Sequence, residues 1–131
     1  MPARIGSLVQ RFYDQLWNRW DDSAVDQVLA PGFSFRGSLG RETSGREGWR
    51  RYRDQVRQGA PDFHNEVVDM VVQRTRAAAR LRYTGMHTGP LLGISATSRA
   101  FSYEGAAFFT AEAGFLQSAW VLGDLDGLSV S

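Results

Sequence analysis

The first twenty residues carry apolar side chains at intervals of three and four positions. These side chains are Ile5, Leu8, Val9, Phe12, Leu16 and Trp20. The spacing predicts one long amphipathic helix that ends near Trp20. A short second helix is predicted over 24–29, because Pro31 and Gly32 follow it directly and favour a helix end.

The next segment changes from alternation to a loop and back to a helical pattern. Residues 33–36 alternate between apolar and polar side chains, which predicts a short strand. The stretch 37–45 is polar and rich in glycine, and we expect a loop there. Ser44 followed three positions later by Glu47 is a capping-box pattern, which predicts a third helix that runs to about Gln58.

The second half of the chain has the alternation and the β-branched and aromatic content of strands. Hairpin connections are predicted at 73–75 and 113–114, between strands over 63–73, 76–87, 99–112 and 115–124. Helices followed by strands indicate an α+β fold, with an antiparallel sheet covered on one face by the helices. At 131 residues the chain is expected to form a single domain, 1–131.

Composition removes several kinds of chemistry. The chain has no cysteine and no lysine, so disulfides, thiolate nucleophiles and a lysine Schiff base are excluded. Its only two histidines are His64 and His87, and no His-Glu-x-x-His spacing occurs. We therefore expect no metal and no cofactor, and either acid–base chemistry or ligand binding.

The charge pattern favours neither nucleic acid nor membrane as a partner. Net charge is +1, and no apolar run approaches the roughly 20 residues that a membrane span needs. A cytoplasmic protein is expected. The arginines between 46 and 57 fall mostly opposite the apolar stripe of the third helix, which indicates a solvated face, and a phosphate-bearing ligand is the alternative.

Strand alternation gives an expected orientation for three ionisable side chains, Asp124, His87 and His64. Each is in phase with mainly apolar positions on its strand, so all three are expected on the covered side of the sheet unless a bulge intervenes. A bulge at Gly85 would reverse His87. A carboxylate among apolar groups has its pKa raised toward neutrality and suits proton transfer, and a nearby imidazole can polarise a substrate carbonyl.

These residues also have simpler interpretations. Asp124 near a strand end could serve a turn or cap, and His87 could satisfy loop backbone groups. Most aromatic side chains must fill the core. We nevertheless expect some of them to shape a concave apolar pocket beside His64, namely Tyr13, Trp17, Phe35, Trp49 and Trp120.

Two motifs carry a family resemblance. Residues 84–94 read Thr-Gly-Met-His-Thr-Gly-Pro-Leu-Leu-Gly-Ile, and the last strand has a Trp-x-x-x-Asp-x-x-Gly-Leu pattern made by Trp120, Asp124, Gly127 and Leu128. These segments, with 12–18 and 61–64, resemble the SnoaL-like polyketide cyclase family of the nuclear transport factor 2-like superfamily. Departures from the family pattern are Ala119, where many members have His or Tyr, and Ser98, where Gly is usual.

The resemblance implies a cone-like barrel, in which a strongly curved mixed sheet wraps around a deep apolar pocket. It also implies a homodimer formed through the outer face of the sheet. The implied activity is a cofactor-independent intramolecular aldol cyclisation of a polyketide ester, with Asp124 as the acid–base residue and His87 in the pocket.

Three hypotheses follow. The leading one is a cyclase-like enzyme acting on an apolar, carbonyl-rich small molecule. The second is epoxide hydrolysis or dehydration in the same pocket, which needs a second carboxylate or an arginine beside Asp124, with Arg80 or Arg82 as the available candidates. The third is a non-catalytic module that binds a small molecule as a dimer.

Overall fold

A computed structural model describes residues 4–91 and 96–125 of the chain. Its N-terminal half is helical, apart from two strands. The helical elements are α1 (Ile5–Arg11), the π-helix η1 (Phe12–Trp17), the 3-10 helix η2 (Asp22–Ala24), α2 (Val25–Val28) and α3 (Gly45–Gly59). In the described part of the chain, none of the helices has the length and apolar character that would let it cross a bilayer.

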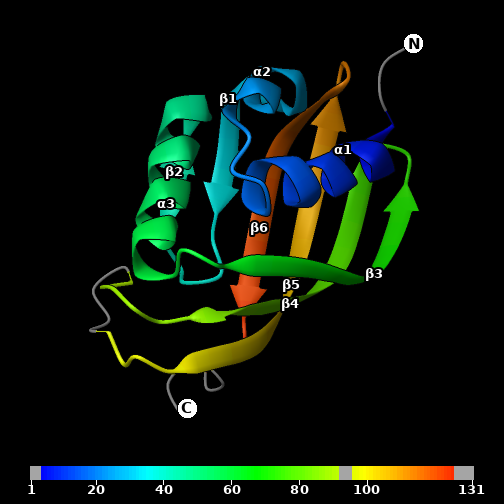
Figure 1. The fold of residues 1–131 in the computed structure, drawn as a ribbon. Coiled ribbons are helices and arrows are strands. Elements are labelled where there is room, and N and C mark those ends of the chain that lie inside the picture. The colour runs from blue at the N-terminus through cyan, green and yellow to red at the C-terminus, as the bar shows by residue number, and fades with distance from the viewer. Residues whose placement is uncertain (1–3, 92–95, 126–131) are drawn as a thin grey trace.

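Six strands form one mixed, unclosed sheet in the order β2-β1-β6-β5-β4-β3. Only the β1–β6 pair is parallel, and the other pairs are antiparallel. The strands are β1 (Leu29–Arg36), β2 (Glu42–Ser44), β3 (His64–Gln73), β4 (Arg76–Met86), β5 (Ala100–Glu112) and β6 (Phe115–Gly123). The helices lie on one side of this sheet (Figure 1).

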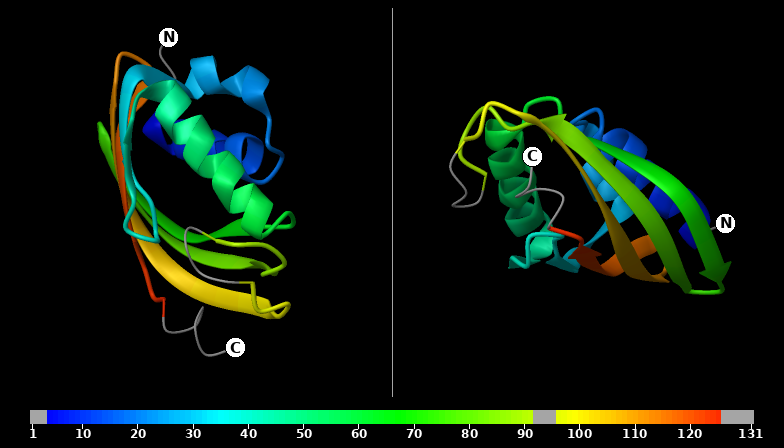
Figure 2. Two further views of the ribbon diagram at one scale, coloured as in Figure 1. Left: turned by 90° about the vertical axis from the view of Figure 1, so that its left-hand side faces the viewer. Right: turned by 90° about the horizontal axis from the view of Figure 1, so that it is seen from below.

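The sheet curves strongly, and its concave side faces the helices (Figure 2). The buried side chains of the helices and of the inner sheet face form one cluster that is rich in aromatic residues. The predicted α+β fold, with a curved and mostly antiparallel sheet around N-terminal helices, is therefore confirmed.

Local differences from the sequence prediction have physical causes. The first helix widens after Arg11 into a π-helix, in which the Asn18 N–H donates to the Tyr13 carbonyl at 2.8 Å. Pro31 and Gly32 do not end a helix but lie exposed in β1, where the pairing with β6 is irregular. Proline is tolerated at such a bulge because no ladder hydrogen bond is required there.

The polar segment before α3 is not wholly a loop. Residues Glu42–Ser44 pair with β1 as the short edge strand β2. Helix α3 begins directly after Ser44, as predicted, but the Ser44 side chain makes no capping hydrogen bond. The capping-box pattern therefore located this helix start without providing the side-chain bond it usually indicates.

Two bulges determine which side chains face the helices. Gln117 is the extra residue in β6, because Thr110 pairs with Ser118 while Ala111 pairs with Leu116. Val68 is the extra residue in β3 for the same reason. Each additional residue exchanges the two faces of the strand beyond it, since side chains alternate with a period of two.

Candidate functional site

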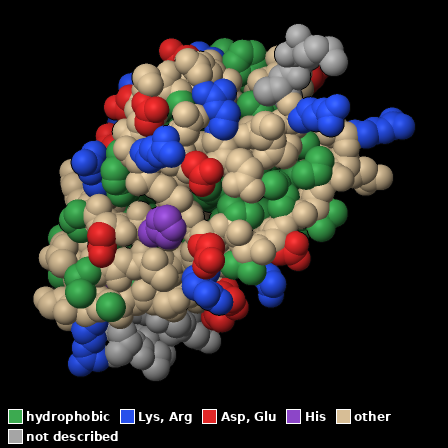
Figure 3. Space-filling model, turned by 45° about the vertical axis from the view of Figure 1, so that its right-hand side comes forward, with side chains coloured by type: hydrophobic (Ala, Val, Ile, Leu, Met, Phe, Trp, Pro, Cys, Tyr) green, Lys and Arg blue, Asp and Glu red, His purple; other side chains and the backbone are tan. Residues whose placement is uncertain are grey.

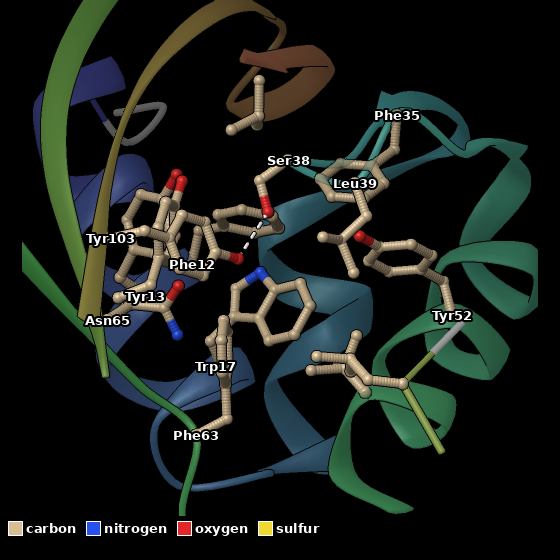
Figure 4. A pocket seen from close by; sticks show the side chains of 14 residues that line it. Phe12, Tyr13, Trp17, Phe35, Ser38, Leu39, Tyr52, Phe63, Asn65 and Tyr103 are labelled. Atoms are coloured by element: carbon tan, nitrogen blue, oxygen red, sulfur yellow. Dashed lines mark hydrogen bonds between the residues drawn. The ribbon is translucent and has the colours of Figure 1, made fainter. Parts of the chain in front are cut away.

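A narrow pocket lies between the helices and the concave sheet face (Figure 4). It is lined by Phe12, Tyr13, Trp17, Phe35, Ser38, Leu39, Tyr52, Val56, Phe63, Asn65, Tyr83, Leu91, Tyr103 and Val121. The space between these side chains totals about 390 Å³ with its open end included, but the part wide enough for water-sized spheres is only about 20 Å³. That is room for about one water molecule, so a larger ligand must displace side chains. The deep pocket that the family resemblance implies is therefore narrow in this structure.

Tyr13 reaches this pocket from the π-helix η1. The buried residues of this helical turn are Phe12, Tyr13, Leu16 and Trp17. The Asn18 side chain holds the end of this turn, because its amide donates to the Asn65 carbonyl and its oxygen accepts from the Asn65 N–H. Such π-helical turns are frequent at functional sites.

Two tyrosine rings in the pocket lie against glycines. A Cβ at Gly37 would come within 2.1 Å of the Tyr52 hydroxyl oxygen, and one at Gly105 within 2.7 Å of the Tyr83 ring. These separations are shorter than any real carbon contact, so the two rings occupy space that a side chain would otherwise fill. Glycine at these positions is therefore needed for the rings to lie where they do.

The ring of Tyr103 also lies close to a glycine, but at a longer distance. A Cβ at Gly123 would lie 3.0 Å from Ser38 atoms and 3.1 Å from the Tyr103 ring. The hydroxyl groups of Ser38 and Tyr103 form a hydrogen bond of 2.9 Å across the pocket (Figure 4). The loop between β1 and β2 is thereby joined to β5 at this side of the pocket.

All four tyrosines of the chain line this pocket. Burial raises the pKa of Tyr13, Tyr52 and Tyr83 far above that of an ordinary phenol, and raises the pKa of Tyr103 to about 12. The neighbouring phenols add to the effect at Tyr83, because a second negative charge there would be repelled. All four hydroxyl groups are therefore uncharged at neutral pH and keep the proton that a hydrogen-bond donor needs.

The Tyr13 hydroxyl is the unusual one. Its oxygen is buried and has no hydrogen-bond partner among the described residues. Buried polar atoms without a partner are rare and costly, because they lose their bonds to water without replacement. The arrangement can therefore offer an uncharged donor to an acceptor atom of a small apolar molecule.

The predicted orientation of Asp124 is wrong. The bulge at Gln117 turns Ala119 and Val121 inward, and Trp120 and Leu122 outward, and Asp124 follows them in an exposed position just beyond β6. Its backbone N–H donates to the Glu104 carbonyl at 2.7 Å. Asp124 does not line the pocket, although the preceding Gly123 packs against Ser38 and Tyr103, which do.

His87 is buried, as its phase along β4 predicts, and no bulge occurs at Gly85. Its main chain pairs with Arg99 and Ser98, and its Nδ1 lies 3.4 Å from the Thr97 hydroxyl. Its Nε2 is buried without a partner among the described residues. His87 is not part of the pocket lining, although Leu91 of the same segment is.

The predicted binding residues divide into two groups. Tyr13, Trp17 and Phe35 line the pocket together, whereas Trp49 is buried behind them, 5.6 Å from Trp17 between ring centroids. His64 and Trp120 are exposed and do not line the pocket. For both of these residues the cause is a bulge, at Val68 in β3 and at Gln117 in β6.

The family model for the SnoaL-like polyketide cyclases matches residues 7–129 of the chain. The chain belongs to this family. The match includes residues 92–94 of the glycine-rich motif and Gly127 and Leu128 of the C-terminal motif, all of which lie outside the described residues. No curated protein matches the chain in sequence.

Solved structures agree with the SnoaL-like assignment at the level of the fold. TsrD from Streptomyces laurentii is 28% identical, with 96% of this chain and 92% of that chain covered and a TM-score of 0.82. A candidate SnoaL-like polyketide cyclase from Jannaschia sp. CCS1 is 20% identical, covers 99% and 93%, and has a TM-score of 0.85. A SnoaL-like polyketide cyclase from Agrobacterium tumefaciens is 17% identical, covers 98% and 97%, and has a TM-score of 0.83.

Charged groups of this SnoaL-like protein lie outside the pocket lining. Arg80 and Arg82 are exposed, and Arg82 lies 3.6 Å from Glu66, so neither supplies the cation that an epoxide-opening site beside Asp124 requires. On the face shown in Figure 3, arginine and acidic side chains are interspersed and not separated by sign. Within residues 4–91 and 96–125, no cluster of His, Cys, Asp or Glu could hold a metal ion.

Three arginines of α3 form ion pairs with described residues, namely Arg46, Arg50 and Arg53. Arg46 pairs with Asp26 and Arg50 with Glu47, which agrees with the prediction of a solvated face. Arg53 is the exception, because it is 2% exposed and packs over the Trp49 ring. Its guanidinium is bound by Asp22 and Asp54 and contacts the Leu16 carbonyl of the π-helix.

The prediction from the sequence missed five hydroxyl- or amide-bearing residues of the pocket lining: Ser38, Tyr52, Asn65, Tyr83 and Tyr103. A signal for two of them was present, since Tyr83 is in phase with Leu81 and Tyr103 with Phe101 on adjacent strands. Weighting tyrosine above other aromatics at inward positions would have identified both, because tyrosine alone combines a large ring with a hydroxyl group.

Proposed function

We propose that this protein is a cofactor-independent cyclase-like enzyme that carries out intramolecular aldol-type chemistry on an apolar, carbonyl-rich small molecule. The observation that carries this proposal is the aromatic pocket with the buried and unpartnered Tyr13 hydroxyl. An aromatic lining favours a flat or folded apolar substrate, and a lone buried donor fixes the position of one carbonyl oxygen.

The proposed role of Tyr13 is to donate a hydrogen bond to the substrate carbonyl that becomes an enolate. Negative charge then develops on that oxygen, and a preorganised donor in a site without water stabilises it more than solvent would. The raised pKa of Tyr13 suits this role, because the phenol keeps its proton while the substrate oxygen carries the charge.

Asp124 remains the proposed acid–base residue, as its place in the Trp-x-x-x-Asp motif of the family suggests. Asp124 is exposed, so the proposed role depends on access to the substrate along Gly123, Ser38 and Tyr103. His87 is the proposed second polarising group, supported by its buried Nε2 and by Leu91 of the same segment in the pocket lining.

A simple test substrate for this chemistry is 2-(2-oxopropyl)benzaldehyde. A base removes a proton from its terminal methyl group, the resulting enolate carbon attacks the aldehyde carbon, and the aldehyde oxygen takes up the proton. Loss of one water then gives 2-naphthol, whose fluorescence reports turnover. Asp124→Asn is expected to lower kcat roughly 10²-fold or more if Asp124 transfers the proton.

The matched control for this test is Asp69→Asn, which removes an exposed carboxylate elsewhere on the sheet. We expect it to leave turnover unchanged. Equal rates for Asp124→Asn and the unaltered protein would remove Asp124 from the mechanism. An absence of any rate above buffer, for this aldehyde and for longer polyketone analogues, would favour the non-catalytic binding module.

We also propose that two copies of the chain associate through the convex sheet face. This face exposes Phe108, Trp120 and Leu122 at 52%, 44% and 53% of their surfaces, and large apolar side chains gathered on one surface favour association. Sedimentation equilibrium is expected to give a dimer that Leu122→Asp converts to a monomer. A monomer before any substitution would contradict this proposal.

A further inference from the structure

We propose that the pocket selects an uncharged ligand that accepts a hydrogen bond from Tyr13, such as an aryl ketone, and rejects the corresponding carboxylate. This inference concerns the site of the proposed function and narrows its substrate class. It depends on the ligand entering the pocket but does not depend on turnover.

The first support is the absence of ionic groups from the lining. None of the fourteen lining residues that the structure describes is Asp, Glu, Arg or His. The nearby guanidinium of Arg36 is directed elsewhere, since it donates to the Val121 carbonyl at 2.6 Å and lies 4.9 Å from the Trp120 ring centroid. A carboxylate in this pocket would have no cationic partner among these residues and would lose its hydration.

The second support is how the chain uses its tyrosines. All four line the pocket, whereas other aromatics are divided between the two sheet faces, with Phe108 and Trp120 exposed. The polar parts of the lining are therefore mostly phenol groups. Burial keeps these phenols protonated, and for the same reason it disfavours a charged ligand beside them.

The third support separates Tyr13 from two of the other phenols, Tyr52 and Tyr103. The Tyr103 hydroxyl is already bonded to Ser38, and the Tyr52 hydroxyl interacts with the backbone of Leu39. The Tyr13 hydroxyl has no partner in the part of the chain that is described, so its proton is available. A ligand acceptor satisfies this proton, whereas a ligand that only donates leaves it unbonded.

The experiment uses three naphthalenes of similar size, titrated into the whole protein by isothermal calorimetry. The probes are 2-acetonaphthone, which is an uncharged acceptor, 2-ethylnaphthalene, which has no acceptor, and 2-naphthoate, which is an anion. We expect the ketone to bind about tenfold more tightly than the hydrocarbon, as a single well-formed hydrogen bond allows. The anion is expected to bind at least tenfold more weakly than the ketone.

Tyr13→Phe isolates the responsible hydroxyl. We expect it to abolish the preference for ketone over hydrocarbon while leaving the affinity for 2-ethylnaphthalene unchanged. Tyr103→Phe is the matched control, because it removes one hydroxyl from the same pocket that already has a protein partner. It should retain the ketone preference. Near-ultraviolet circular dichroism of each variant checks that the aromatic packing is preserved.

Several outcomes would overturn the inference. These are 2-naphthoate binding as tightly as the ketone, a ketone preference that persists in Tyr13→Phe, or no binding of any probe up to its solubility limit. The results are separable from those on turnover. Ketone selectivity without conversion of the aldehyde would leave this inference standing and reject the proposed cyclase activity.

Discussion

The two faces of the sheet contain similar side chains but have opposite properties. The concave face buries its rings in a continuous cluster, in which Phe109 packs 5.8 Å from Phe12 and 6.0 Å from Tyr13 between centroids. The convex face exposes its rings, with Phe108 6.0 Å from Trp120 and Arg36 over that indole. Aromatic content therefore does not distinguish a pocket from a surface, whereas the choice of tyrosine and the absence of charge do.

The strand β4 shows the same contrast within one element. Its inward positions are small, aliphatic or phenolic: Ala77, Ala79, Leu81 and Tyr83. The outward positions of the same stretch are Arg76, Ala78, Arg80 and Arg82, so all of its charged side chains lie on the outer face. A strand that separates charge from apolar groups this completely specifies its own orientation, because a slip of one residue would bury the arginines.

The largest expected difference in stability is between substitutions at two adjacent residues on opposite faces of the sheet, Phe109 and Phe108. Phe109→Ala should lower the free energy of unfolding by about 3–5 kcal/mol, because it opens a cavity beside Phe12 and Tyr13. Phe108→Ala on the opposite face should cost less than about 1 kcal/mol in the monomer. Urea denaturation of both variants in the Leu122→Asp background, which is expected to be monomeric, measures the difference. Similar losses in that background would mean that Phe108 is packed within the monomer.

The glycine contacts provide the next test of the concave face. Gly37→Ala should lower the free energy of unfolding by about 1–3 kcal/mol and weaken ligand binding, because the new Cβ displaces the Tyr52 ring. Gly32→Ala is the control, since a Cβ there meets nothing within 4 Å. Thermal melts and calorimetric titrations compare the two. A tolerated Gly37→Ala would show that the Tyr52 ring can shift without cost.

The buried phenols predict loss of stability in alkali. An ordinary phenol has a pKa of 10.0, and each pocket tyrosine has a higher pKa when folded, so above pH 10 the unfolded chain releases protons that the folded chain keeps. Stability should therefore be unaffected below pH 10 and fall above it. The expected slope is about 1.4 kcal/mol per pH unit for each phenol that ionises only on unfolding. Tyr13→Phe should reduce this slope by one phenol in urea titrations between pH 9 and pH 12.

The smallest expected change in the free energy of unfolding is for a contact on the convex face. Arg36 stacks on Trp120 in a partly exposed position, where a cation–π contact contributes about 0.5–1 kcal/mol. A double-mutant cycle with Arg36→Met and Trp120→Leu should give a coupling energy in this range. A coupling energy of zero would leave the hydrogen bond from Arg36 to the Val121 carbonyl as the interaction that holds the guanidinium.

The periodicity of apolar residues in the sequence was sufficient to predict the architecture and most of the helices and strands. The strands were located to within one or two residues at most ends, because turn residues such as Ala113-Gly114 mark them clearly. The edge strand β2 was missed, since three polar residues carry no alternation signal. The π-helix was missed because its extra residue in the turn leaves the apolar positions compatible with a regular helix.

The candidate site was predicted less completely than the fold. Tyr13, Trp17 and Phe35 line the pocket as expected, and the other predicted site residues do not, namely Asp124, His87, His64, Trp49 and Trp120. His87 and Trp49 are buried outside the lining. Two bulges account for the outward positions of Asp124, His64 and Trp120, and neither involves a glycine or proline that would reveal it. Orientation inferred from alternation is reliable only along an uninterrupted ladder, as for His87, which directly follows β4.

The bulge at Gln117 keeps the inner face of β6 continuous although the sequence slips by one position. Leu116 faces inward opposite Ala111 before the bulge, and Ala119 faces inward opposite Phe109 beyond it. Deleting Gln117 would leave each of these partners on β5 unchanged, so Ala119 and Val121 would stay inside and Trp120 and Asp124 outside. A homologue shortened by this one residue would therefore still present its terminal acid to solvent.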